Sequence, residues 1–113
     1  MKTSYFGNLR NVSNPLSISG KAPSWYNGPQ ILAPKYGFFK DRKDGKIDDI
    51  GYTEQFCDLV LKPLDVIQTY HHLIETYGED VTLLCYEKPG QFCHRRIVAS
   101  WFELSLQVQV PEL

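Results

Sequence analysis

Residues 81–104 read VTLLCYEKPGQFCHRRIVASWFEL, and this stretch contains three different patterns in succession. Residues 81–86 form a short apolar run rich in β-forming side chains, which predicts a strand buried on both faces. Residues 87–92 contain a Pro-Gly pair, which is typical of a turn. Residues 93–104 carry several apolar side chains, among them Ile97 and Trp101, and are predicted to be helical. The stretch therefore predicts a strand, a turn and a helix.

The segments on either side of this stretch extend the same alternation. Residues 63–77 predict a helix, with Pro63 in its first turn and Gly78 just after its end. Residues 53–61 also predict a helix, which Thr53 would cap. Residues 106–110 alternate apolar and polar side chains and predict a last strand.

The first half of the chain is richer in loop signals. Residues 4–9 and 16–19 predict short strands, and residues 20–34 predict a long loop because glycines and prolines interrupt them. Residues 40–49 mix both charges and predict a solvated surface loop. Taken together, the predicted elements indicate an α/β fold. We expect a small three-layer domain with a mostly parallel sheet flanked by helices.

Length and composition limit the kinds of protein this can be. The 113 residues, 42% of them hydrophobic, are enough for one core, so residues 1–113 are predicted to form a single domain. The net charge of -1 argues against a nucleic-acid binder that works by charge alone, but it leaves room for a local basic patch. No apolar run approaches the roughly 20 residues of a membrane span. Three cysteines and no signal peptide predict reduced thiols in a cytoplasmic protein.

The turn from strand to helix carries the candidate functional residues. A helix start offers free backbone N–H groups and a partial positive charge, and Lys88, His94 and Arg95 add cationic donors beside it. Basic residues in the first turn of a helix are locally unfavourable, and such misfits tend to mark function. A phosphate-bearing small molecule or a nucleic acid is therefore the expected ligand.

Two residues of this turn are candidates for catalysis. Cys93 would lie at the helix N-cap, where its thiol pKa should fall and favour a nucleophilic thiolate. Glu87 would act as a general acid or base if the turn partly buries it. The non-catalytic alternatives are that Cys93 is a structural or anion-site cysteine and that Glu87 is solvated or paired with an arginine. A phosphatase loop is excluded, because no Arg stands six residues after Cys85 or Cys93.

A metal site is not expected at this turn. Cys85, Cys93, His94 and Glu87 are residues of zinc-ligand type, but their spacing does not match common zinc-finger patterns. Cys85 is expected to be a core residue, and the sequence does not identify a cofactor.

Further candidates stand in the first half of the chain. Ser19 and Lys21 follow a predicted strand and could join an anion site at the strand ends. Trp25 and Tyr26 lie on the long loop, where they could stack on a base or cover the core. Tyr36 and Tyr52 are interpreted as packing residues.

The whole pattern resembles the domain of unknown function 488 family. The resemblance rests on residues 83–95, LLCYEKPGQFCHR, and extends to SISGKAPSWY at residues 17–26. It implies a compact α/β fold and does not name a biochemical role. Many members have an Arg after the Ser-Ile-Ser strand, where this chain has Gly20-Lys21, and a lysine would hold an anion only as a point charge.

Three hypotheses remain open at this point. The protein is an enzyme that acts through Cys93 or Glu87 on a phosphate-bearing small molecule, a nucleotide or a nucleic acid. Alternatively, it is a non-catalytic module that binds such a ligand. In the third hypothesis it is an interaction protein in which the Cys-His-Arg turn is structural and Arg95 is paired internally.

Overall fold

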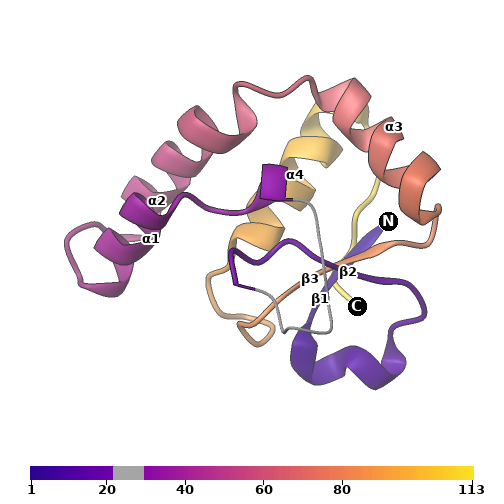
Figure 1. Ribbon diagram of the computed structural model, residues 1–113, viewed down its shortest axis with the longest axis horizontal. Coiled ribbons are helices and arrows are strands. Elements are labelled where there is room, and N and C mark those ends of the chain that lie inside the picture. Colours follow the sequence, from indigo (N-terminus) through magenta and orange to yellow (C-terminus); the bar gives the residue numbers. More distant parts are fainter. Residues whose placement is uncertain (22–29) are drawn as a thin grey trace.

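The computed structural model describes residues 1–21 and 30–113 of the chain, and its centre is a small parallel sheet (Figure 1). The three strands are β1 (Lys2–Tyr5), β2 (Pro15–Ser17) and β3 (Thr82–Cys85). They lie in the order β1-β3-β2, and both outer strands run parallel to β3. All four residues of β3 are buried, as a strand in the middle of a sheet requires. The α/β class and the parallel sheet are thereby confirmed.

Helices make up most of the remaining described chain. The α-helices are α1 (Tyr36–Lys43), α2 (Asp49–Phe56), α3 (Val66–Tyr77) and α4 (His94–Leu106). Two short 3-10 helices, η1 (Phe6–Asn11) and η2 (Gln30–Leu32), and a π-helical turn, η3 (Cys57–Leu61), complete the elements. None of the described helices is both long and apolar enough to cross a membrane.

Helix α4 connects the sheet to the other helices. It packs against β1 and β3, and its buried residues Val98, Ala99 and Phe102 face the core. In Figure 1, α3 lies on one side of α4, while α1 and α2 lie on the other and extend away from the sheet. The apolar core therefore fills the space between the sheet and the helices.

Several predicted helices are confirmed, with shifted starts. The predicted helix 53–61 begins at Asp49, and its cap is Asp48, whose side chain accepts a hydrogen bond from the Gly51 N–H at 2.8 Å. Thr53 lies inside the helix, so its predicted capping role is wrong. The predicted helix 63–77 begins at Val66, where Asp65 is the cap. Asp, Ser and Thr are similarly good N-cap residues, so when two of them lie one turn apart the sequence does not show which one begins the helix.

The predicted last strand at residues 106–110 is wrong. Leu106 still belongs to α4, and the segment after it has no strand partner. Its backbone is held by side chains instead: the Val110 N–H donates to Glu103 and the Val110 carbonyl accepts from Arg96. A single bridge pairs Thr3 with Glu112 beyond it. The alternating pattern of residues 106–110 is therefore present although this segment is not a strand of the sheet.

Two further predictions need correction. The first strand was expected at residues 4–9, but β1 ends at Tyr5, opposite Cys85, because its partner β3 ends there. The surface loop expected at residues 40–49 is partly helical, since α1 runs to Lys43. After α1 the chain turns at Gly45, which adopts a positive φ of 77°.

Candidate functional site

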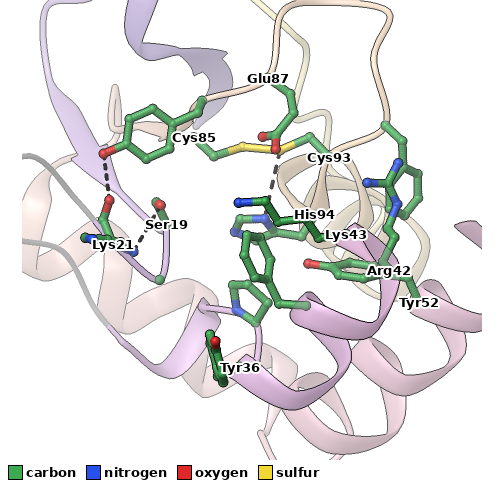
Figure 2. A pocket seen from close by; sticks show the side chains of 15 residues that line it. Ser19, Lys21, Tyr36, Arg42, Lys43, Tyr52, Cys85, Glu87, Cys93 and His94 are labelled. Atoms are coloured by element: carbon green, nitrogen blue, oxygen red, sulfur yellow. Dashed lines mark hydrogen bonds between the residues drawn. A yellow bond between two sulfur atoms is a disulfide. The ribbon is translucent and has the colours of Figure 1, made fainter. Parts of the chain in front are cut away.

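A pocket of about 620 Å³ opens at the carboxyl ends of β2 and β3. Parallel strands all end at the same edge of a sheet, and ligands of α/β proteins gather beyond that edge. The start of α4, helix α1 and Tyr52 of α2 form the other walls. Figure 2 shows Ser19 and Lys21 on one side, Arg42 and Tyr52 on the other, and the two cysteines with Glu87 above.

The structure brings most of the predicted site residues into this pocket. Five of them line it although they come from two distant parts of the sequence: Ser19, Lys21, Glu87, Cys93 and His94. Lys88 and Arg95 do not line it. Trp25 and Tyr26 lie outside the described residues.

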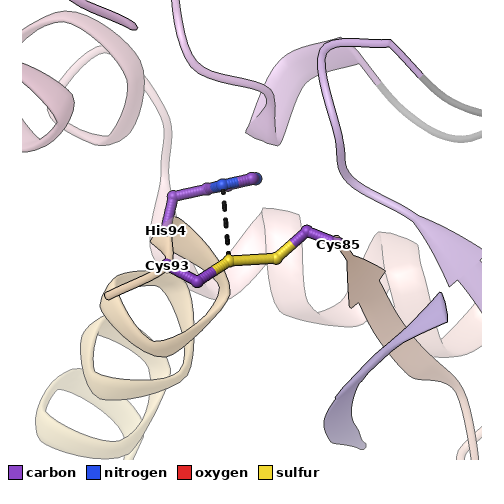
Figure 3. Close-up of side chains that lie close together, drawn as sticks. All are labelled: Cys85, Cys93 and His94. Carbon is purple, nitrogen blue, oxygen red and sulfur yellow. Dashed lines mark hydrogen bonds between the residues drawn. A yellow bond between two sulfur atoms is a disulfide. The ribbon is translucent and has the colours of Figure 1, made fainter. Parts of the chain in front are cut away.

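Cys85 and Cys93 are joined by a disulfide (Figure 3), which crosses the top of the pocket in Figure 2. The expectation of three reduced thiols is therefore wrong, because only Cys57 is free. Cys85 is the last residue of β3 and Cys93 directly precedes α4, so the strand–turn–helix connection places the two sulfurs together. In this oxidised form Cys93 has no thiol that could act as a nucleophile.

His94 is held in one tautomer. Its Nε2 lies 2.8 Å from the Ile18 carbonyl oxygen, which can only accept, so Nε2 carries the proton. Burial lowers the pKa of His94 below 6.5, and the ring is neutral at pH 7. The unprotonated Nδ1 then faces the Cys93 Sγ at 3.9 Å. The ring therefore presents a lone pair to the sulfur.

Arg95 points into the protein rather than into the pocket. Its side chain is 1% exposed, and its guanidinium donates to both carboxylate oxygens of Glu112, the closest at 2.7 Å. Nη1 donates to the Glu87 carbonyl oxygen at 2.7 Å and to the Cys85 Sγ at 3.2 Å. Arg95 thus ties the turn to the C-terminal segment and holds Glu87 and Cys85 in place.

Of the three positive charges that the described residues place at the pocket, Lys21 was expected from the sequence and two others were not. Lys21, Arg42 and Lys43 line it, against one carboxylate, Glu87. Arg42 also lies 4.5 Å above the Phe92 ring and pairs with Asp49. Arg42 and Lys43 belong to α1. The mixed charges of this segment had predicted a surface loop. A pocket-facing role could not be derived from that pattern.

Aromatic residues form another part of the wall. Tyr36 and Phe39 of α1 line the pocket and are 74% and 41% exposed. Tyr52 is buried, and burial together with the nearby charge of Glu87 raises its pKa above 10. The interpretation of Tyr36 as a packing residue is wrong, whereas Tyr52 packs in the core and also reaches the pocket.

The comparison with known proteins adds the family. A sequence model described as "Active DUF488-N3 subclade" matches residues 10–106, which include the Cys-His-Arg turn and every pocket residue named above. The chain belongs to the DUF488 family. No curated protein and no solved structure matches the chain.

Gly20-Lys21, the position at which the family resemblance leads us to expect an arginine, lines the pocket. Two hydrogen bonds fix the backbone there: the Lys21 N–H donates to Ser19 Oγ at 3.2 Å, and Tyr86 Oη donates to the Lys21 carbonyl oxygen at 2.6 Å (Figure 2). The side chain of Lys21 is therefore presented at the pocket by a defined turn.

Proposed function

We propose that the pocket binds a phosphate-bearing ligand, and that a nucleotide is the ligand class that suits it best. The observation that carries this proposal is the excess of three cationic side chains over one carboxylate around a cavity of about 620 Å³. Ligand pockets commonly measure about 300–1,000 Å³. Lysine and arginine in a partly enclosed site favour phosphate, and a nucleotide supplies both the charge and a flat base.

The walls of the pocket divide between these two parts of a nucleotide. Lys21 and Lys43 would hold the phosphate close to the start of α4, where the helix adds a partial positive charge. Tyr36 and Phe39 offer aromatic faces on which a base would stack. From the sequence, Trp25 and Tyr26 were the candidates for stacking on a base. In this proposal, two residues of α1 take that role instead.

The chemistry would take place at Cys93 and Glu87. Once a dithiol reductant has opened the disulfide, His94 Nδ1 accepts the proton of the Cys93 thiol. The sulfur then forms a bond to the electrophilic atom of the ligand, the bond from that atom to the leaving group breaks, and the protonated Glu87 carboxyl gives its proton to the leaving group. The resulting Glu87 carboxylate takes a proton from water, whose oxygen bonds to the same atom while the bond to sulfur breaks and Cys93 recovers its proton from His94.

A second candidate is a binding module without catalysis, in which the Cys-His-Arg turn is structural. The burial of Arg95 and its pairing with Glu112 favour this candidate. Under it, phosphate binding at the lysines persists and the reactive residues can be replaced without loss.

Binding is tested by calorimetric titration of the reduced protein with inorganic phosphate and with nucleoside monophosphates and diphosphates. The double variant Lys21→Ala/Lys43→Ala should raise Kd at least about tenfold, since each charged hydrogen bond contributes about 1.5–3 kcal/mol. Lys88→Ala is the matched control, because Lys88 is exposed and does not line the pocket. Equal loss in both variants, or no binding by the wild type, would refute the proposal.

Catalysis is tested by the release of phosphate or base from the same nucleotides under reducing conditions. Cys93→Ser and Glu87→Gln should each lower kcat about 100-fold or more, since general acid–base groups contribute about 10²–10⁴-fold. Cys57→Ser is the control. If both variants turn over like the wild type while phosphate still binds, the binding-module candidate replaces the enzyme.

A further inference from the structure

Three potential metal ligands meet at the top of the pocket. The Sγ atoms of Cys85 and Cys93 and a ring nitrogen of His94 all lie within 4.8 Å of one another, and all three residues are buried (Figure 3). We propose that, in the reduced protein, Cys85, Cys93 and His94 bind one Zn²⁺ ion through two thiolates and Nδ1. Two sulfurs and one imidazole form a donor set that suits zinc.

The surroundings of the ligands match those of metal-binding residues. A metal-ligating histidine usually donates its second N–H to a carbonyl or carboxylate, which fixes the ring and its tautomer. Nε2 of His94 does this with the Ile18 carbonyl, and Nδ1 is left free on the side of the sulfurs. The Cys85 Sγ accepts a hydrogen bond from Arg95 Nη1, which would stabilise it as a thiolate.

Charge balance favours the same arrangement. Two thiolates and one Zn²⁺ sum to zero, so the ion neutralises a pair of charges that would be costly to bury alone. The disulfide is also neutral. The buried site therefore has two electrically neutral forms, one oxidised without metal and one reduced with metal.

The backbone leaves room for the ion. The Cα atoms of Cys85 and Cys93 are 7.5 Å apart. Around a tetrahedral zinc with Zn–S bonds of about 2.3 Å, the two sulfurs would stand about 3.8 Å apart. Side-chain rotation can supply this separation. With a Zn–N bond of about 2.0–2.1 Å, Nδ1 and Sγ would stand about 3.6 Å apart, and their present distance of 3.9 Å is close to that.

The sequence spacing argued against a metal because it matches no zinc-finger pattern. Those patterns place ligands in pairs a few residues apart, whereas the proposed ligands come from the end of β3 and from the two adjacent residues at the start of α4. Cys93 is extended, with φ -154° and ψ 142°, so the chain turns between Cys93 and His94. Adjacent residues can therefore direct both side chains to one point.

Three protein ligands leave the fourth zinc position open. Cys85, Cys93 and His94 all line the pocket, as does Glu87, so this position would face the ligand cavity. An open position with a carboxylate beside it is the arrangement by which zinc enzymes activate water. The inference rests on the proposed function only for this last point, because ion binding itself does not need the lysines. With zinc bound, Cys93 becomes a ligand, and Glu87 takes the proton of the water.

The direct test is zinc stoichiometry and affinity by competition with a chromophoric chelator. The chain reduced with a phosphine should bind one Zn²⁺, and the same chain with its disulfide intact should bind none. Cys85→Ser and Cys93→Ser should each weaken binding by more than about 100-fold, beyond the usual effect of losing an outer-shell partner. Cys57→Ser is the matched control and should bind like the wild type. A reduced wild type that binds no more zinc than the oxidised chain overturns the proposal.

A second measurement does not depend on whether the variants fold. Co²⁺ added to the reduced wild type should give the visible bands of a tetrahedral centre and thiolate-to-cobalt charge transfer. Zinc should also protect Cys85 and Cys93, but not Cys57, from iodoacetamide, as read by mass spectrometry. A cobalt spectrum without thiolate charge transfer, or equal alkylation with and without zinc, contradicts the site. Phosphate binding is measured separately, so either proposal can fail alone.

Discussion

At the scale of single residues, Arg95 has the largest number of polar partners in the Cys-His-Arg turn. It donates five hydrogen bonds: three to the two carboxylate oxygens of Glu112 in the C-terminal segment, and one each to the Glu87 carbonyl and the Cys85 sulfur at the turn. Burying a guanidinium without partners would cost several kcal/mol, so these contacts must persist together. Arg95 therefore belongs to the frame of the site rather than to its binding surface.

Removing this side chain should destabilise the protein strongly. We expect Arg95→Ala to lower the free energy of unfolding by about 3–5 kcal/mol, because Arg95 is 1% exposed and its removal leaves a cavity and takes a donor from Glu112, the Glu87 carbonyl and the Cys85 sulfur. Glu112→Gln keeps one acceptor oxygen and should cost less, about 1–2 kcal/mol. The measurement is urea unfolding followed by circular dichroism. The control is Arg10→Ala on the exposed 3-10 helix η1, and an equal effect there would contradict the framing role.

His94 should make stability depend on pH. Burial lowers its pKa in the folded state, whereas the unfolded chain titrates near 6.5, so between these two values the unfolded state holds the extra proton. Stability is then complete above pH 6.5 and falls as pH drops toward the folded pKa, by up to about 1.4 kcal/mol per pH unit. Urea unfolding of the oxidised, metal-free protein at pH 7.5 and 5.5 measures this loss.

His94→Gln is the comparison for that measurement. Glutamine can still donate to the Ile18 carbonyl but does not titrate, so its loss between the two pH values should be smaller. Glu112 acts in a different window. Burial raises its pKa, but hydrogen bonds from Arg95 and Thr3 outweigh this and leave it below 4.5. Its stabilising effect is therefore lost only below about pH 4.5. An unchanged slope in His94→Gln would refute the assignment.

At the scale of elements, the ends of the helices are set by particular backbone positions. Helix α3 is followed by Gly78, which has φ 108° and ψ 156°, a region that is essentially restricted to glycine. A Cβ there would lie 3.0 Å from Asn14 Nδ2 and 3.1 Å from Asp80 Oδ1. The Asn14 side chain also donates a hydrogen bond to the Tyr77 carbonyl, which holds Asn14 close to Gly78. This glycine allows α3 to turn directly into β3.

Two glycine substitutions should have opposite effects. Gly78→Ala should lower the free energy of unfolding by about 1–3 kcal/mol, because alanine is strained at this φ and ψ. For Gly37→Ala in α1, no atom of the described residues lies within 4 Å of the new Cβ apart from its chain neighbours and the helix backbone, and the change should raise the free energy of unfolding by about 0.5–1 kcal/mol. Thermal unfolding of both variants under the same conditions tests the pair. A loss at both positions would show that the added methyl group, rather than the backbone conformation, is responsible.

At the scale of the whole molecule, the disulfide closes only a short loop. Cys85 and Cys93 are 8 residues apart, and the apolar core lies between the sheet and the helices rather than at the disulfide. Closing so short a loop stabilises a protein by about 2–3 kcal/mol. Reduction should therefore leave the fold intact, as both the proposed thiol chemistry and the zinc site require.

This can be measured without any substitution. Reduction should lower the free energy of urea unfolding by about 2–3 kcal/mol and leave the far-ultraviolet circular dichroism unchanged. Cys57→Ser should show the same difference between its oxidised and reduced forms, since Cys57 is not in the disulfide. Loss of the circular dichroism signal on reduction would rule out a folded, reduced site.

The sequence by itself determined the local order of strand, turn and helix around Cys85 and Cys93, because those patterns depend on neighbouring residues. Apolar runs and periodic faces were enough to predict β3, α3 and α4 and the α/β class. They were not enough for the C-terminal segment: residues 107–110 alternate like a strand, but Glu103 and Arg96 satisfy the Val110 backbone groups.

Only the tertiary structure decided which side chains share the pocket. The parallel order β1-β3-β2 brings Ser19 and Lys21 beside Glu87, Cys93 and His94, while the packing of α1 and α2 adds Arg42, Lys43, Tyr36 and Tyr52. The same packing turns Arg95 inward to Glu112. The physical reason is that contacts between distant segments depend on how whole elements pack, and a local pattern does not record its distant partners.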